Sequence, residues 1–107
     1  MIGLVMQFQG ETMEVRVVGK VVVFRTSQFQ RFTEIDGLKI DKSGALKEFP
    51  DLKDKKDWKE ITIKRFKEKI KKMKSEDERI KYVMEDLIKY GYKPLYIQKQ
   101  GFRPVKI

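Results

Sequence analysis

Two valine-rich segments on either side of Gly19-Lys20 constrain the fold more than any other feature of the chain. Glycine at the first central position suits a type II′ turn, which joins antiparallel strands in a two-residue hairpin. If Val18 pairs with Val21, one face of the hairpin is wholly apolar, and the other brings Glu14 opposite Arg25 as a favourable cross-strand pair. The apolar face would hold Met13, Val15, Val17, Val22 and Phe24. One register accounts for both faces, so we predict an antiparallel hairpin here.

The rest of the first half also follows strand and turn patterns. Residues 2–8 alternate, and the expected core face holds Ile2, Leu4, Met6 and Phe8. Asp36-Gly37 predicts a second hairpin, of type I′, that matches Glu34 with Lys39. Its apolar side would hold Thr33, Ile35, Leu38 and Ile40. Residues 41–44 predict another turn, and residues 45–49 a last short strand.

The second half has the three-to-four-residue apolar spacing of amphipathic helices. Residues 50–56 are polar, include a proline and form the expected connector. Asp57 with Glu60 predicts a capping box for a helix over 58–74, and Ser75 with Glu78 predicts one for a helix over 76–90. The stripe expected to be buried on that second helix is Ile80, Val83, Met84, Leu87 and Ile88. Gly91 is the expected terminator.

The C-terminal residues predict a strand or a hairpin around Lys99-Gln100-Gly101. Pro94 and Pro104 favour a position at a sheet edge, although a basic hairpin after a helix could also act as a DNA-binding wing. We therefore predict one α+β domain over 1–107. Its antiparallel sheet of N-terminal hairpins, within 1–49, would be packed by two consecutive amphipathic helices, and 57–107 would end in the strand or hairpin.

The chain lacks both cysteine and histidine. This excludes disulfides, thiol nucleophiles, histidine relays and zinc sites built on thiolate or imidazole, and it fits a reducing cytoplasm. No phosphate-binding glycine loop occurs, and carboxylates at Glu34, Asp41 and Asp51 do not have the spacing of a nuclease magnesium site. No apolar run is long enough to span a bilayer, and the start lacks the basic lead of a signal peptide. We predict a cytoplasmic, non-enzymatic protein without metal or cofactor.

Seven of the nine net positive charges lie between Lys53 and Lys74. There Ile63, Phe66, Ile70 and Met73 form an apolar ridge, and four lysines repeat its spacing one residue later, about 100° round a helix. We call these four the lysine ridge: Lys64, Lys67, Lys71 and Lys74. Ammonium groups on successive turns can follow a phosphate backbone and release its counterions.

Other interpretations of this helix remain open. It could be a solvated face, because Glu68 lies three or four residues from several of the basic residues. It could also lie on a membrane surface with Trp58 as an anchor. A charged content of 38% is typical of thermophile surfaces, so heat stability is a rival explanation for the lysines.

A second basic segment interleaves aromatic residues with arginine and glutamine, as proteins that bind single-stranded nucleic acid do. Its candidate contacts are Arg25, Phe29, Arg31 and Phe32, although the phenylalanines could equally fill the core. We predict binding of DNA or RNA, mainly through phosphates and with low sequence specificity. The alternative is a thermophile interaction or oligomerisation protein, such as a homodimer, whose lysines serve solubility and stability.

Overall fold

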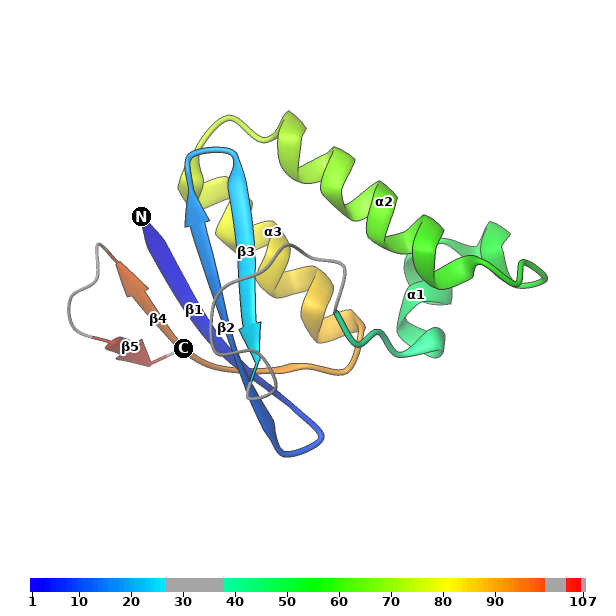
Figure 1. Cartoon of the computed structure of the whole chain (residues 1–107), viewed down its shortest axis with the longest axis horizontal. Helices are drawn as coiled ribbons and strands as arrows, with labels where there is room; N and C mark the ends of the chain where they lie inside the picture. The colour runs from blue at the N-terminus through cyan, green and yellow to red at the C-terminus, as the bar shows by residue number, and fades with distance from the viewer. Residues whose placement is uncertain (27–37, 100–103, 107) are drawn as a thin grey trace.

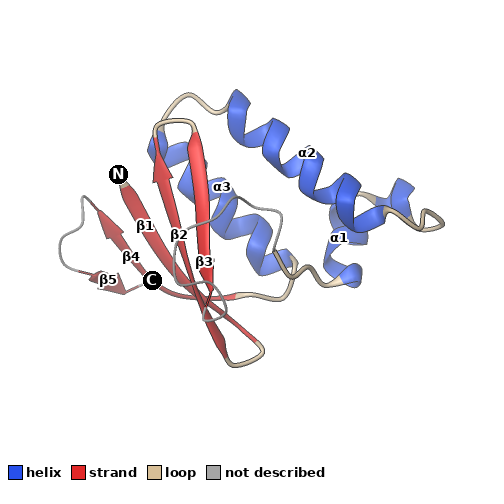
Figure 2. Ribbon diagram, viewed as in Figure 1, coloured by secondary structure: helices blue, strands red, loops and turns tan. Residues whose placement is uncertain are grey.

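The computed structural model describes residues 1–26, 38–99 and 104–106. Its centre is a five-stranded sheet in which all neighbouring strands are antiparallel. Helices lie over one face of this sheet (Figure 1). Figure 2 shows the same separation of a strand layer from a helix layer. The predicted α+β class is confirmed.

The sheet has the strand order β3-β2-β1-β4-β5. A meander of β1 (Ile2–Phe8), β2 (Glu11–Val18) and β3 (Val21–Thr26) supplies one side. On the other side of β1, the sheet continues with β4 (Lys93–Lys99) and β5 (Pro104–Lys106). The central strand is therefore β1, and it pairs with both the next strand along the chain and a strand from the far end.

The β2–β3 hairpin has the predicted register. Val18 pairs with Val21, and Glu14 pairs with Arg25. Gly19 has φ of 59°, the positive value that the first central position of a type II′ turn requires. The predicted apolar face is buried and joins the core: Met13, Val15, Val17, Val22 and Phe24. In β1, Ile2, Leu4 and Met6 are buried as predicted, and Phe8 is partly buried against the same core.

Three helices pack on this core. α2 (Trp58–Lys72) and α3 (Glu76–Lys89) are the two predicted helices, and α1 (Lys42–Glu48) precedes a short 3₁₀ turn, η2 (Pro50–Leu52). α3 contacts β1, β2 and β4, whereas α2 makes its main contacts with α1 and α3. Both helices were expected to pack on the sheet, and α3 does so by direct contact. The buried residues of α2 reach the same core beside α3.

The ends of α2 and α3 differ in how they are capped. Ser75 Oγ accepts a hydrogen bond from the Glu78 N–H at 3.1 Å, which is one half of the predicted capping box, while the Glu78 carboxylate accepts the N–H of Lys74 rather than that of Ser75. Asp57 makes no such side-chain bond, so the predicted capping box at the start of α2 is wrong although the helix begins where expected. α2 ends at Lys72, two residues early, because Met73 is extended. Gly91 ends α3 with φ of 103°.

One buried residue of α3 was predicted wrongly. Ile88 is 46% exposed, whereas Ile80, Val83 and Leu87 are buried and Met84 packs partly buried against the core. With 3.6 residues per turn, Ile80, Val83 and Leu87 lie on one side of the helix. Ile88 comes one residue after Leu87 and is therefore turned away from that side, towards solvent.

The predicted strands over residues 38–49 are wrong. Residues 38–40 form no strand, although Leu38 and Ile40 are buried. The expected turn and strand at 41–49 are instead the start and body of α1. Asp41 caps this helix by accepting the Ser43 N–H at 3.2 Å. Lys39, expected opposite Glu34, contacts Glu11 at 2.8 Å, and residues 33–37 lie outside the described part of the chain.

Gly44 explains why this segment can be a helix against α3. A Cβ atom at Gly44 would lie 1.7 Å from the backbone oxygen of Lys89. The missing side chain therefore lets α1 cross the end of α3 at backbone contact, and Asp41 N–H donates to the Tyr90 carbonyl at 3.1 Å beside it. Tertiary contact thus selects the helix over the turn that the same residues also favour.

The C-terminal strands form the predicted hairpin, with β5 at the sheet edge. The expected edge position holds for Pro94 as well, because β5 pairs only with Tyr96, Ile97 and Gln98, so that among the described residues β1 is the one strand beside Pro94. Pro94 lies opposite Met6, where the β1–β4 register shifts. A proline without an N–H is tolerated at such an irregularity because no ladder hydrogen bond is lost there.

Arg79 connects three segments near the start of α3. It is 3% exposed, and its guanidinium donates to the carbonyls of Gly19 at 2.6 Å, Met73 at 2.5 Å and Ile70 at 3.3 Å. These carbonyls belong to the β2–β3 turn and to the end of α2. One cation therefore holds the hairpin tip and donates to carbonyls at the end of α2, where helical partners run out.

Candidate nucleic-acid interface

The lysine ridge is divided between α2 and the segment that follows it. Lys64 and Lys71 are exposed, and Lys67 is half-buried. From Lys64 to Lys71 the helix rises about 10 Å. Lys74 is exposed beyond the end of α2, where its backbone N–H donates to Glu78 Oε2 at 3.3 Å. Three of the four lysines thus share one helix, and the fourth continues past its C-terminus.

The opposite flank of α2 faces α1 and uses its cations in the fold. Arg65 forms a two-pronged ion pair with Asp51, at 2.9 and 3.0 Å. Lys69 Nζ lies 3.1 Å from Glu48 Oε1. Both cations also lie over the ring of Phe49, at 5.0 Å for Arg65 and 4.9 Å for Lys69. These two basic residues are engaged in joining α2 to α1 and η2.

Electrostatics along α2 follow this division. The hydrogen bond from Arg65 holds the pKa of Asp51 below its ordinary value, and the same bond raises the pKa of Arg65. The negative charge of Glu68 also raises the pKa of Arg65. Part of the influence of Glu68 therefore acts on the flank that faces α1. Lys69, Lys71 and Lys72 lie in the last turn, where cations are favourable to the helix dipole.

Arg25 lies apart from the lysine ridge. It alternates with Phe24 and therefore points to the sheet face that the helices do not cover, where Glu14 is its hydrogen-bonding partner. Phe29, Arg31 and Phe32 lie outside the described residues. The two predicted groups of site residues are thus not brought together at Arg25, and any contact through it would be made by a different surface.

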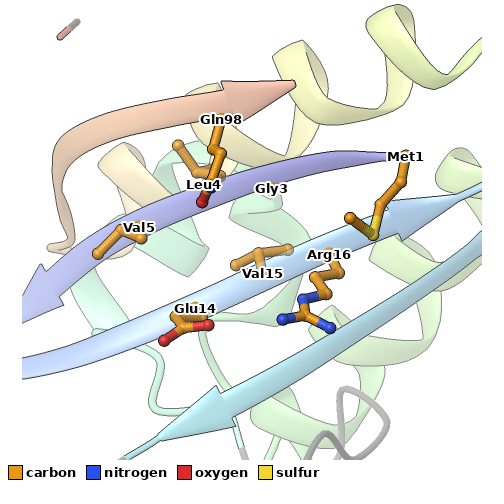
Figure 3. A pocket seen from close by; sticks show the side chains of 8 residues that line it. All are labelled: Met1, Gly3, Leu4, Val5, Glu14, Val15, Arg16 and Gln98. Carbon is orange, nitrogen blue, oxygen red and sulfur yellow. The ribbon is translucent and has the colours of Figure 1, made fainter. Parts of the chain in front are cut away.

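This outer sheet face carries a small hollow of about 140 Å³. Figure 3 shows Gly3 at its middle, between Arg16 and Gln98. These are the cross-strand neighbours of Gly3 on β2 and β4, so its missing side chain leaves the space open. Glu14 also lines the hollow, but its carboxylate is already paired with Arg25.

A group of polar side chains, with two carboxylates buried at its centre and two exposed lysines at its rim, lies where α1, α2 and α3 meet. We call it the junction cluster, made of Glu48, Lys69, Tyr82, Asp86, Lys89 and Tyr90. The Tyr90 hydroxyl donates to Glu48 Oε2 at 2.9 Å and lies 3.4 Å from Asp86 Oδ2. Tyr82 donates to Glu48 Oε1 at 3.2 Å. The side chains of Glu48 and Asp86 are only 6% and 2% exposed.

Sequence reasoning missed the junction cluster. Glu48 fell in a segment predicted to be a strand, so nothing placed it near α3. A signal was nevertheless present, because Tyr82, Asp86 and Tyr90 recur at four-residue intervals beside the apolar stripe of α3. That spacing puts three polar side chains on one helix flank.

Neither a metal centre nor a membrane-spanning helix is found in the described residues. Over 1–26, 38–99 and 104–106, no group of three or more acidic side chains is placed to hold a metal ion. In the same part of the chain, every helix is too short or too polar to cross a bilayer. Comparison of the chain with protein-family models, curated proteins and solved structures gives no match.

Proposed function

We propose that the protein is a non-enzymatic nucleic-acid-binding protein that holds the phosphate backbone along the lysine ridge, on α2 and just past its C-terminus. Contacts of this kind give affinity and position but little sequence information, because ammonium groups meet phosphate oxygens rather than base edges. Either DNA or RNA could supply the phosphates. Arg25 is not required for this contact, since it lies on another surface and is bonded to Glu14.

The difference between the two flanks of α2 carries this proposal. On the flank facing α1, Arg65 and Lys69 have carboxylate partners. Lys64 and Lys71 are exposed, and among the described residues no carboxylate oxygen lies within 4.0 Å of either ammonium group. Charges that only stabilised the helix would gain from such partners. The unpaired charge is instead available to a polyanion.

Fluorescence anisotropy with labelled duplex DNA, single-stranded DNA and RNA tests the proposal. We expect log K to fall against log salt with a slope near −4 on duplex DNA, for about four to five phosphate contacts. The double variant Lys64→Gln/Lys71→Gln should flatten this slope by about 2 and weaken binding roughly 50-fold near 0.1 M salt. Neither side chain is buried, so folding should be preserved.

The matched control is Lys81→Gln/Lys93→Gln, which removes the same charge from exposed positions on α3 and β4. This control should bind within about twofold of the unaltered protein, because neither lysine is on the ridge. Equal losses in both double variants would mean that net charge alone attracts the nucleic acid. Undiminished binding in the ridge variant would contradict the proposed site.

A second candidate function is association with another protein or a second copy of the chain. The observation favouring it is the exposed valine pair at the tip of the β2–β3 hairpin, where Val18 is 52% and Val21 57% exposed. The lysines would then serve solubility and heat stability. A chain that binds none of the three nucleic acids at low salt, yet sediments as a dimer, would favour this function instead.

A further inference from the structure

The junction cluster places two carboxyl groups side by side in the interior. Glu48 comes from the last residue of α1, and Asp86 comes from α3. Tyr90 bridges them, with its hydroxyl 2.9 Å from one carboxylate and 3.4 Å from the other. One hydroxyl has a single proton to donate. Two ionised carboxylates on either side of one hydroxyl, in a poorly hydrated site, would repel each other strongly.

The compensating charges around the pair are unequal. α2 supplies Lys69, whose ammonium group lies 3.1 Å from Glu48. α3 supplies Lys89, at a longer 3.9 Å from Asp86, and the neutral hydroxyls of Tyr82 and Tyr90. α1 supplies only Glu48 itself to this site. Glu48 therefore has the closer cation and more hydrogen-bond donors, which makes Asp86 the natural holder of a proton.

The expected titration agrees with this geometry. Burial, followed by the hydrogen bond to Glu48 and the charge of that group, raises the pKa of Asp86 to about 7. Burial alone would also raise the pKa of Glu48, but hydrogen bonds from Asp86, Tyr90 and Lys69 outweigh it and hold that pKa below its ordinary value. Asp86 is thus favoured as the protonated acid and Glu48 as the ionised carboxylate.

We propose that Glu48 and Asp86 share one proton below neutral pH, and that its loss as the pH rises weakens the docking of α1 on α2 and α3. In the protonated pair, the Asp86 carboxyl donates to the Glu48 carboxylate and ties α1 to α3. When Asp86 gives its proton to solvent, that bond is replaced by repulsion between two buried charges. The cluster then acts as a pH-sensitive latch for α1.

The composition of the chain makes this latch measurable. With no histidine or cysteine, the only group that ordinarily titrates between pH 6 and 8.5 is a terminal amine. Trp58 is the single tryptophan, and it packs partly buried against the core next to α1. The Lys42 ammonium group of α1 lies 6.0 Å from its ring. Movement of α1 should therefore change tryptophan emission.

The experiment follows Trp58 emission from pH 5 to 9, together with amide hydrogen exchange in α1 at pH 6 and 8, corrected for intrinsic exchange. We expect a sigmoidal emission change with a midpoint near 7 and faster exchange in α1 above it. Asp86→Asn should abolish both changes, because an amide cannot ionise. The matched control Glu85→Gln removes an exposed carboxylate from the same helix and should keep them.

Glu48→Gln tests the sharing of the proton separately. It removes the charge that Asp86 faces, so the emission midpoint should move to lower pH by on the order of one unit. An unchanged midpoint in this variant would show that the two groups do not share a proton. Emission that stays flat in the unaltered protein, or a transition that survives Asp86→Asn and so belongs to the terminal amine, would overturn the proposal.

Discussion

Arg79 shows how one side chain can set the relative position of three elements. Its guanidinium presents donors in several directions, and three of them meet backbone carbonyls of the hairpin turn and the end of α2. Arginine is suited to this role because its charge is delocalised and its planar donors are fixed in geometry. The same contacts explain why a charged residue can be buried in the stripe of α3.

We expect Arg79→Met to lower the free energy of unfolding by about 3 kcal/mol, because three carbonyls lose charged hydrogen-bond donors. Arg79→Lys should cost less, since an ammonium group can still reach some of these acceptors. Urea unfolding followed by circular dichroism measures both values. A loss below about 0.5 kcal/mol in Arg79→Met would show that water replaces the guanidinium without cost.

At the scale of elements, the two N-terminal caps of α2 and α3 form a natural comparison. Ser75 makes the capping bond, whereas Asp57 does not. We expect Ser75→Ala to lower stability by about 1 kcal/mol. Asp57→Ala should lower it by less than about 0.5 kcal/mol, leaving only the interaction with the helix dipole. Thermal unfolding of the two variants gives this difference, and equal losses would contradict the assigned caps.

Elements governed by local patterns could be predicted from sequence. The register of the β2–β3 hairpin followed from one turn and two alternating segments, and apolar spacing with polar cap residues located α2 and α3 to within two residues at each end. α1 could not be predicted because Asp41 and Ser43 serve a turn and a helix cap equally well. The contact of Gly44 with Lys89 decides between them, and it joins segments distant in sequence.

Part of the candidate site could likewise be predicted from sequence, and part depended on tertiary packing. Helical spacing alone placed Lys64 and Lys71 on one side of α2, away from its buried face. It could not reveal that Arg65 and Lys69 are already bound, because their partners Asp51 and Glu48 are positioned by α1 and η2. Ion pairs between elements depend on packing, so composition overstates the charge that is free to meet a ligand.

At the scale of the whole molecule, the junction cluster predicts how stability varies with pH. The raised pKa of Asp86 contributes stability that is full below its unfolded value near 4 and is lost as the pH rises through about 7. The lowered pKa of Glu48 acts oppositely: its contribution is present above the unfolded value and is lost on acidification. Between pH 5 and 8 the Asp86 effect should therefore dominate.

We expect the free energy of unfolding to fall by roughly 2 kcal/mol from pH 5 to pH 8. In Asp86→Asn this fall should nearly vanish, because the amide remains neutral throughout. Urea unfolding at several pH values provides the measurement, with Glu85→Gln as the exposed counterpart. Stability that rises steadily across this range would mean that other groups outweigh the buried pair.

The place of β1 at the centre of the sheet has a consequence for the order in which the molecule assembles. On one side β1 pairs with β2 across a two-residue turn, so that ladder closes a short loop. On the other side it joins position 3 to position 98. Closing so long a loop costs more chain entropy, and distant pairings slow folding. The meander can therefore form early. Pairing of β1 with β4 brings together residues from the two ends of the chain and is expected to form later.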